Sequence, residues 1–270
     1  MGADRPGAGA QGRVQPLTLK PPPDRLYGRL RSHSLRPRQA LLLERTLPRL
    51  RFEAAWAVDP LAAFALHPPP PLVRFAAQAP SRGEGEGAGL RRLWLEVGFG
   101  AGEHALAQIA AHRDVGLIAC EVFETGICSL LSHLVPQGGE ATAPLPANLK
   151  LWDDDARTLL RLLPDACLDA VFLLFPDPWP KARHTKRRFV HPALLPTIAR
   201  VLRPGAEWRI ASDDPTYQQW VTEVLAGQAW FEVPAPVAAR PAGWPPTRYE
   251  AKAIKAGRQP RYWSLTRAAT

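Results

Sequence analysis

Cysteine is scarce in this chain, and long apolar runs are missing from it. Only three of the 270 residues are cysteines, Cys120, Cys128 and Cys167, and no two of them have CxxC or other zinc-ligand spacing. An odd number of thiols without such spacing argues against a disulfide framework and against a structural zinc site. No run approaches membrane-spanning length, and the first residues lack the apolar stretch of a signal peptide. The sequence therefore predicts a cytoplasmic protein without a metal or a membrane contact.

Acidic residues are too few to balance the basic ones. Lysine and arginine together number 34 against 25 aspartates and glutamates, which gives a formal net charge of +9. A surface of that sign attracts polyanions, and phosphate backbones are the most common polyanions in a cell. A generally arginine-rich composition would give the same excess, so the local clustering of charge has to decide between these readings.

Composition divides the chain into three segments. Residues 1–25 are rich in glycine, proline and arginine and predict a flexible basic tail. Residues 26–89 predict a basic arm, one helix near Arg38–Thr46 and a closing loop. Residues 90–270 alternate short apolar runs with helical patterns, which is typical of an α/β domain with a mostly parallel central sheet and helices on both faces, a Rossmann-like fold.

The same alternation gives the approximate bounds of the elements. Strands are predicted at 93–97, 116–122, 148–152, 168–175 and 206–212, and helices at 104–112, 125–135, 155–163 and 192–202. The last helix is expected to end in a turn at 203–205. Residues 136–147 are predicted to form an inserted loop that bulges from the surface. No internal repeat is present.

A glycine-rich turn, EVGFGAG at Glu96–Gly102, follows the first predicted strand. Gly98, Gly100 and Gly102 let the backbone approach a ligand closely because they carry no Cβ. Their spacing is GxGxG, whereas GxGxxG is the pattern that rests a dinucleotide pyrophosphate on a helix N-terminus. The turn therefore predicts a site for a phosphate-free nucleoside such as S-adenosylmethionine, and it disfavours a nucleotide-dependent dehydrogenase.

Acidic side chains stand at the ends of the next two predicted strands. Glu121 is placed to accept hydrogen bonds from ribose hydroxyls, and Asp155 is placed for the adenine amino group. Taken singly, Glu121 is explained as a surface carboxylate and Asp155 as a helix N-cap. Because open α/β sheets bind ligands at the carboxyl ends of their strands, the ordered series favours a nucleoside site.

An acid between prolines, followed by a basic cluster, occupies FPDPWPKARHTKRR at 175–188. The two prolines restrict the backbone around Asp177. A cluster of this density suits several phosphates, although alone it would indicate a solvated loop. Next to an acidic loop at the cofactor edge, it predicts a clamp for RNA. The predicted RNA-binding residues are Arg183, His184, Thr185, Lys186, Arg187 and Arg188, with Lys181 directly before them.

These motifs together resemble the bacterial tRNA (guanine-N7-)-methyltransferase family from Tyr27 to the C-terminus. The matching motifs are EVGFGAGE, FPDPWPK with HTKRR, ASD at 211–213 and TRYE at 247–250. The resemblance implies a class I methyltransferase that transfers a methyl group from S-adenosylmethionine to N7 of guanine 46 in the tRNA variable loop. It implies cofactor binding by Glu96, Glu121, Asp155 and Asp177, of which Asp177 is also the catalytic residue. It implies substrate binding by Lys181, Asp213, Thr247, Arg248, Tyr249 and Glu250.

Two alternatives to this function stay open. One is a methyltransferase of the same fold that acts on another RNA. The other is a non-catalytic RNA-binding module, for which the basic tail and the clamp suffice, but which leaves Glu96, Glu121 and Asp155 without a purpose. A monomer is expected, with a homodimer as the alternative.

Overall fold

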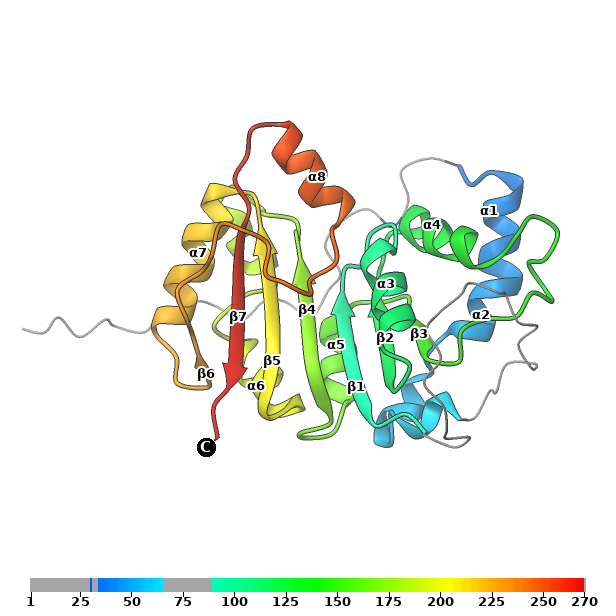
Figure 1. The fold of residues 1–270 in the computed structure, drawn as a ribbon, viewed down its shortest axis with the longest axis horizontal. Coiled ribbons are helices and arrows are strands. Elements are labelled where there is room, and N and C mark those ends of the chain that lie inside the picture. The colour runs from blue at the N-terminus through cyan, green and yellow to red at the C-terminus, as the bar shows by residue number, and fades with distance from the viewer. Residues whose placement is uncertain (1–29, 31–33, 66–88, 270) are drawn as a thin grey trace, which may run out of the picture.

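A single twisted sheet organises residue 30 and residues 34–65 and 89–269, the part of the chain that the computed structural model describes. Seven strands form it in the order β3-β2-β1-β4-β5-β7-β6 (Figure 1). The first five strands are parallel, while β7 runs antiparallel to both β5 and β6. The predicted Rossmann-like α/β fold is thereby confirmed. The predicted tail, residues 1–25, lies outside the described residues.

The bounds of the elements are as follows. The strands are β1 (Arg92–Val97), β2 (Val115–Cys120), β3 (Leu149–Trp152), β4 (Leu168–Leu174), β5 (Leu202–Ser212), β6 (Phe231–Glu232) and β7 (Arg261–Arg267). The α-helices are α1 (Pro37–Leu41), α2 (Leu47–Leu50), α3 (Glu103–Ala111), α4 (Glu124–Leu134), α5 (Ala156–Leu162), α6 (Leu195–Val201), α7 (Pro215–Ala226) and α8 (Arg248–Lys255). A π-helical segment, η1 (Leu42–Thr46), joins α1 to α2, and 3₁₀ helices occupy η2 (Ala54–Val58), η3 (Ala62–Phe64) and η4 (Ala182–Arg187).

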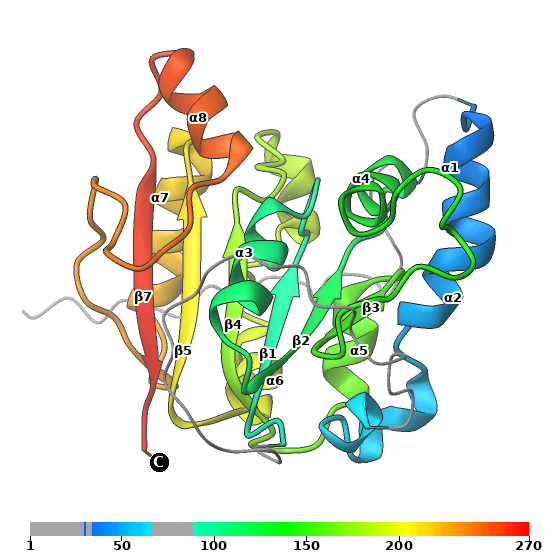
Figure 2. The same ribbon diagram turned by 45° about the vertical axis from the view of Figure 1, so that its right-hand side comes forward.

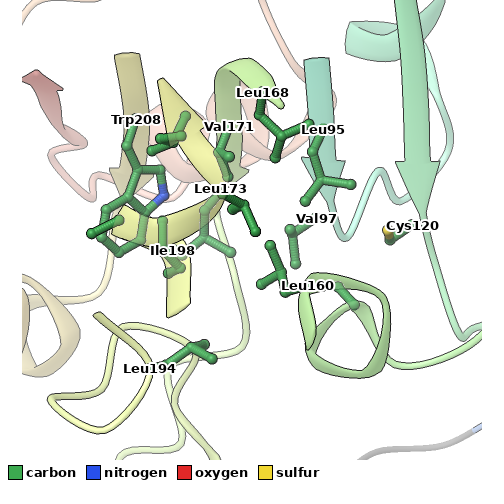
Figure 3. Close-up of a cluster of buried hydrophobic side chains, with 14 of the residues drawn as sticks. Leu95, Val97, Cys120, Leu160, Leu168, Val171, Leu173, Leu194, Ile198 and Trp208 are labelled. Atoms are coloured by element: carbon green, nitrogen blue, oxygen red, sulfur yellow. The ribbon is translucent and has the colours of Figure 1, made fainter. Parts of the chain in front are cut away.

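Apolar strands form the centre of the sheet because helices cover both of its faces. One face packs against α5, α6 and α7, and the other packs against α3, α4 and the helical stretch 37–50. Leu95, Leu173 and Ile198 belong to the first of these two cores (Figure 3), and each is 1% exposed or less. Complete burial of one such side chain contributes about 1.5–3 kcal/mol. Within the described residues, no helix is both long and apolar enough to cross a membrane.

The predicted turn at 203–205 needs a correction. Helix α6 begins at Leu195, where Pro196 fits the first turn, and β5 begins directly after it at Leu202. Leu202 already pairs with Leu168 of β4, and the register shifts before the next pair. The residues expected to form a turn are therefore the irregular first part of a strand. The other predicted strands and helices are confirmed to within a few residues.

The loop at 136–147 is largely exposed, as predicted for a surface bulge, but it also makes tertiary contacts. Glu140 is buried, and its backbone carbonyl accepts a hydrogen bond of 2.7 Å from the Thr46 hydroxyl. Arg49 donates to the Ala143 carbonyl at 2.7 Å. The loop runs beside α1 and α2 (Figure 2), so it docks the N-terminal helical stretch onto the sheet. Leu42 and Leu47 of that stretch share a core with β1 and β2.

Candidate active site

A cavity of about 880 Å³ opens at the carboxyl ends of the parallel strands. It lies where the strand order changes direction, because β1 connects to β2 on one side and pairs with β4 on the other. Open α/β sheets bind ligands at such a point. The loops after β1, β2, β3 and β4 all contribute to its lining, together with the start of α8. The predicted site residues that line it are Gly98, Gly100, Glu121, Asp155, Asp177, Arg187, Arg248 and Tyr249.

The glycine turn adopts a backbone that other residues rarely take. Gly98, Gly100 and Gly102 have φ values of +74°, +61° and +92°. Gly102 does not line the cavity but is the N-cap of α3, and a Cβ on it would lie 2.7 Å from the Leu130 side chain. A Cβ on Gly100 would lie 2.8 Å from the ring of Tyr249. The turn is therefore packed between α4 on one side and the start of α8 on the other.

Glu121 is held at the base of the cavity by the backbone around it. One carboxylate oxygen accepts N–H bonds from Val122 at 2.9 Å and Phe123 at 3.0 Å, and the other accepts from Gly100 at 2.8 Å. Burial raises the pKa of Glu121, and the nearby charge of Asp177 raises it further, while the three N–H donors lower it. The carboxylate is therefore fixed in direction and still borders the open space.

Asp155 is an N-cap that also lines the cavity. As the N-cap of α5, its carboxylate accepts the Arg157 backbone N–H at 2.9 Å. It also forms an ion pair with the Arg157 guanidinium, whose Nε lies 3.0 Å from each carboxylate oxygen. Both residues line the cavity. The ordinary cap is present, and the predicted contact of Asp155 with the cofactor stays a prediction.

Asp177 occupies a loop whose backbone is unusually constrained. Phe175 and Trp179 on either side of it have φ values of +53° and +44°, which non-glycine residues seldom adopt. The Phe175 N–H donates to the Ala211 carbonyl of β5 at 2.8 Å. The Asp177 side chain is exposed and lines the cavity. Because its charge contributes to the raised pKa of Glu121, the two acids share one electrostatic environment.

The basic segment forms η4 and its flanks at the rim of this cavity. Lys181, Arg183 and Lys186 are exposed, and His184 is partly exposed. The pKa of His184 is lowered by partial desolvation and by the surrounding cations. Arg187 lines the cavity with its guanidinium 4.8 Å from the centre of the Trp179 ring. An uncovered cationic surface therefore borders the loop that carries Asp177.

Arg188 does not share this surface, contrary to its predicted place in the RNA-binding stretch. It is 4% exposed and donates to the carbonyls of Pro178 and Trp179 at 3.0 Å and 3.1 Å. The guanidinium also lies 4.9 Å from the centre of the Trp220 ring. The direction of this side chain is set by α7, which the sequence pattern of the loop does not reveal.

Glu96 and Asp213 also lie outside the cavity lining. Glu96 is buried beneath the glycine turn, where a carboxylate oxygen lies 3.0 Å from Nδ1 of His104. The other ring nitrogen of His104 is 3.0 Å from the Gln108 amide nitrogen. Asp213 accepts a hydrogen bond of 2.6 Å from Arg258. In this structure, Glu96 supports the turn from below, and Asp213 fastens the segment before β7.

The TRYE motif begins α8 and divides into two pairs. Thr247 is the N-cap and accepts the Glu250 N–H at 3.1 Å, while the Glu250 carboxylate reaches back to the Thr247 N–H at 3.4 Å. Glu250 also accepts a hydrogen bond of 2.7 Å from the Tyr262 hydroxyl. Arg248 and Tyr249 line the cavity. The cap therefore fixes the start of the helix, and the two residues between its members face the site.

Several lining residues belong to none of the sequence motifs, among them Thr125, Gly126, Ser129 and Arg157. A Cβ on Gly126 would lie 2.4 Å from the backbone carbonyl oxygen of Gly100. A glycine near the start of a predicted helix is a visible signal in the sequence. A glycine is needed at this position because the backbone there contacts the glycine turn at Gly100. Only the tertiary structure shows that contact.

The fold and the cavity together define a class of protein. Five parallel strands followed by a reversed β7 and the short edge strand β6, with an acidic cavity at the switch point of the sheet, are the features of a class I S-adenosylmethionine-dependent methyltransferase. A family model described as "Putative methyltransferase" matches residues 91–261.

Relatives specify the family. The tRNA (guanine-N(7)-)-methyltransferase of Granulibacter bethesdensis is 60% identical over 93% of this chain and 98% of its own. The protein of the same name from Rhodospirillum rubrum is 41% identical over 90% of this chain and 88% of its own. The chain belongs to the tRNA (guanine-N(7)-)-methyltransferase family. Among solved structures, the 16S rRNA methyltransferase KamB aligns at 15% identity with a TM-score of 0.47, over 66% of this chain and 88% of that one, which is too distant to bear on the substrate.

Proposed function

We propose that this protein transfers the methyl group of S-adenosylmethionine to N7 of a guanine in tRNA, at position 46 of the variable loop. The observation that carries the proposal is the sharing of one cavity by the Glu121 nucleoside site and the Asp177 loop, with exposed cations at the rim. The names of the two relatives, which describe them as tRNA (guanine-N(7)-)-methyltransferases, support the choice of substrate and atom.

The residues of the cavity fit the methyl donor. A volume of about 880 Å³ lies within the range of about 300–1,000 Å³ that small-molecule sites usually have. Glu121 is fixed by three N–H donors and keeps acceptor capacity on both oxygens for the ribose hydroxyls. The lining acids Glu121, Asp154, Asp155 and Asp177 favour the cationic sulfonium. When bound, S-adenosylmethionine supplies an electrophilic methyl group.

Asp177 acts without removing a proton. Guanine N7 has an in-plane lone pair and no hydrogen, so it needs no general base before it attacks. Positive charge appears on the imidazole half of the base as the methyl group arrives, and a fixed carboxylate nearby stabilises that charge. Asp177 also offers acceptors to the N–H groups of the purine. The constrained backbone on either side of it limits the directions in which the carboxylate can point.

Binding of the RNA aligns the guanine with the methyl donor, which is the remaining requirement of the reaction. Transfer needs N7, the methyl carbon and sulfur in one line, so holding both reactants supplies a large part of the acceleration. Lys181, Arg183, Lys186 and Arg187 are the proposed phosphate contacts, because they lie beside the cavity and three of them are exposed. Trp179, which also lines the cavity, offers an aromatic surface to a base.

One experiment tests the reaction, the base and the position together. Unmodified tRNA is incubated with the protein and labelled S-adenosylmethionine, then treated with borohydride and aniline, which break the chain at 7-methylguanosine. A single new break at position 46 is expected. Label in the RNA without a break would refute N7 as the target, and a break elsewhere would refute the position. Absence of label would favour a non-catalytic RNA-binding module. We further propose that the protein works in the cytoplasm and is a monomer. Sedimentation of the purified protein with and without tRNA would test the oligomeric state.

A further inference from the structure

One arginine of the basic segment turns inward, and its contacts assign it a different task from its neighbours. Building on the proposed function, we propose that Arg188 is a positioning residue that holds the Asp177 loop in its reactive geometry and does not contact RNA. Its Nε donates to the Pro178 carbonyl at 3.0 Å and its Nη2 donates to the Trp179 carbonyl at 3.1 Å. These are the first two carbonyls after Asp177.

The arginine itself is anchored to the core. Its guanidinium lies 4.9 Å from the centre of the Trp220 ring on α7. Two residues further on, the Val190 carbonyl accepts a 2.6 Å hydrogen bond from Trp220 Nε1, and the Val190 N–H donates to the Tyr217 hydroxyl at 3.3 Å. Val190 and Tyr217 are fully buried. Helix α7 therefore fixes the position from which Arg188 reaches the loop.

The shape of the loop requires a forked donor at this point. Two successive carbonyls converge on one guanidinium because Trp179 adopts a φ of +44° between them. A left-handed conformation of a bulky residue is unfavourable, and it persists only where the surroundings enforce it. A planar guanidinium presents several N–H groups in a rigid fork, whereas the lysine ammonium is a compact group on a flexible stem. A lysine at this position would keep the charge but lose the paired contact.

This difference separates the two possible roles of Arg188. A phosphate contact tolerates lysine, since a point charge still attracts phosphate. The paired contact with two carbonyls does not tolerate it. Without that contact, Trp179 is free to leave its strained conformation, and Asp177 moves with the loop. A displacement of about 1 Å at a reacting group lowers the rate by about 100-fold.

The test uses the full-length Arg188→Lys protein in single-turnover methylation of unmodified tRNA, at saturating S-adenosylmethionine and tRNA. We expect the rate to fall by about 10- to 100-fold, while the Kd for tRNA stays within twofold of wild type and the slope of log Kd against log salt is unchanged. Arg200→Lys is the matched control. Arg200 also donates to two carbonyls, those of Leu160 and Leu163, each at 2.8 Å, but it lies on α6 outside the cavity lining. Its variant should lose thermal stability without losing the saturated rate.

Two results would overturn the assignment. One is a wild-type saturated rate for Arg188→Lys. The other is a weaker Kd for tRNA together with a rate defect that disappears at saturating tRNA, which is the behaviour of a residue that contacts the RNA. If wild type itself forms no 7-methylguanosine in this assay, the proposed function fails, and the placement of Arg188 is judged separately by chemical modification.

Chemical modification measures the accessibility of each arginine in the wild-type protein, so it does not depend on whether a variant folds. An arginine-specific dicarbonyl reagent, read out by peptide mass spectrometry, should modify exposed Arg183 and be blocked there by tRNA. Arg188, which is 4% exposed, should stay unmodified with and without tRNA. Modification of Arg188 in the free protein, with protection by tRNA, would contradict the inward placement.

Discussion

Replacement of Glu121 by glutamine removes one negative charge at the base of the cavity with little change of shape. The carboxylate accepts N–H bonds from Val122 and Phe123 on one oxygen and from Gly100 on the other. A glutamine can keep only one of these oxygens. If the amide oxygen takes the place with two donors, the amide NH₂ must face the Gly100 N–H. Two donors then point at each other and the Gly100 N–H loses its acceptor, while the N–H groups of Gly98 and Phe99 still join the turn to the Cys120 carbonyl of β2.

The size of the effect follows from the hydrogen bonds involved. A hydrogen bond to a charged group contributes about 1.5–3 kcal/mol, and a neutral one contributes about 0.5–1.5 kcal/mol. Two ribose hydroxyls that meet an amide in place of a carboxylate should therefore lose about 2–3 kcal/mol together. That loss corresponds to a Kd for S-adenosylmethionine about 30- to 150-fold weaker.

The assay is calorimetric titration of wild type, Glu121→Gln and Glu232→Gln with S-adenosylmethionine. Glu232 is exposed on β6, at the far edge of the sheet, so its variant controls for the substitution alone. Circular dichroism and Tm establish that each variant is folded. A Kd within twofold of wild type in a folded Glu121→Gln protein would refute the role of this acid in holding the donor.

The pH dependence gives a second readout of the same acid. Burial raises the pKa of Glu121 above its ordinary value near 4.5. The protonated form is favoured in the folded protein, so its contribution to stability is complete below pH 4.5 and is lost as pH rises through the raised pKa. Affinity for the donor should change in the opposite direction, because the carboxylate is the better acceptor. Glu121→Gln should lose the part of each slope that this acid contributes. A pH dependence of donor affinity equal to that of wild type would assign it to another group.

Three further predictions concern the rest of the site. Asp177→Asn should keep the fold while lowering single-turnover methylation at saturating S-adenosylmethionine by about 100- to 1,000-fold, the usual effect of removing one preorganised electrostatic group near the transition state. An unchanged saturated rate would count against a catalytic role. Replacing both Arg183 and Lys186 by alanine should weaken tRNA binding and reduce the slope of log Kd against log salt by about two, one for each lost phosphate contact. An unaltered slope would show that these two residues do not contact the RNA. Gly126→Ala would place a Cβ 2.4 Å from a backbone carbonyl oxygen of the glycine turn, so the Kd for S-adenosylmethionine should rise at least tenfold by calorimetry. The control Gly227→Ala, where a Cβ meets nothing within 4 Å, should bind as wild type does. Equal affinities of the two variants would show that the turn can shift at no cost.

The sequence alone indicates most of the sheet and much of the cavity. Buried parallel strands are apolar throughout, so their positions can be read from composition. Parallel strands also bring their carboxyl ends to one edge, which is why the order of residues along the chain is enough to predict that Glu121, Asp155 and Asp177 lie together. All three line the same cavity.

Helix α8 is harder to infer from the sequence than the sheet. Most of its surface is exposed, since only Glu250 and Ala253 are buried on it. Its start is fixed by the capping pair Thr247 and Glu250, which appears in the sequence only as a short TRYE motif. The family resemblance marks this motif as functional, while the structure divides it into two capping residues and two that face the cavity.

The sequence supplies the residue types and the order of the strands along the chain. These determined that acids and glycines would lie at one end of a parallel sheet. The direction of each side chain in the irregular segments was decided only by tertiary contacts. Arg188 stands in an unbroken basic run, yet Trp220 of α7 and two loop carbonyls turn it inward. Glu96 lies below the turn because β1 is buried on both faces, so that its side chain meets His104 and not the ligand space. Such contacts join residues far apart in the chain, and local pattern carries no information about them.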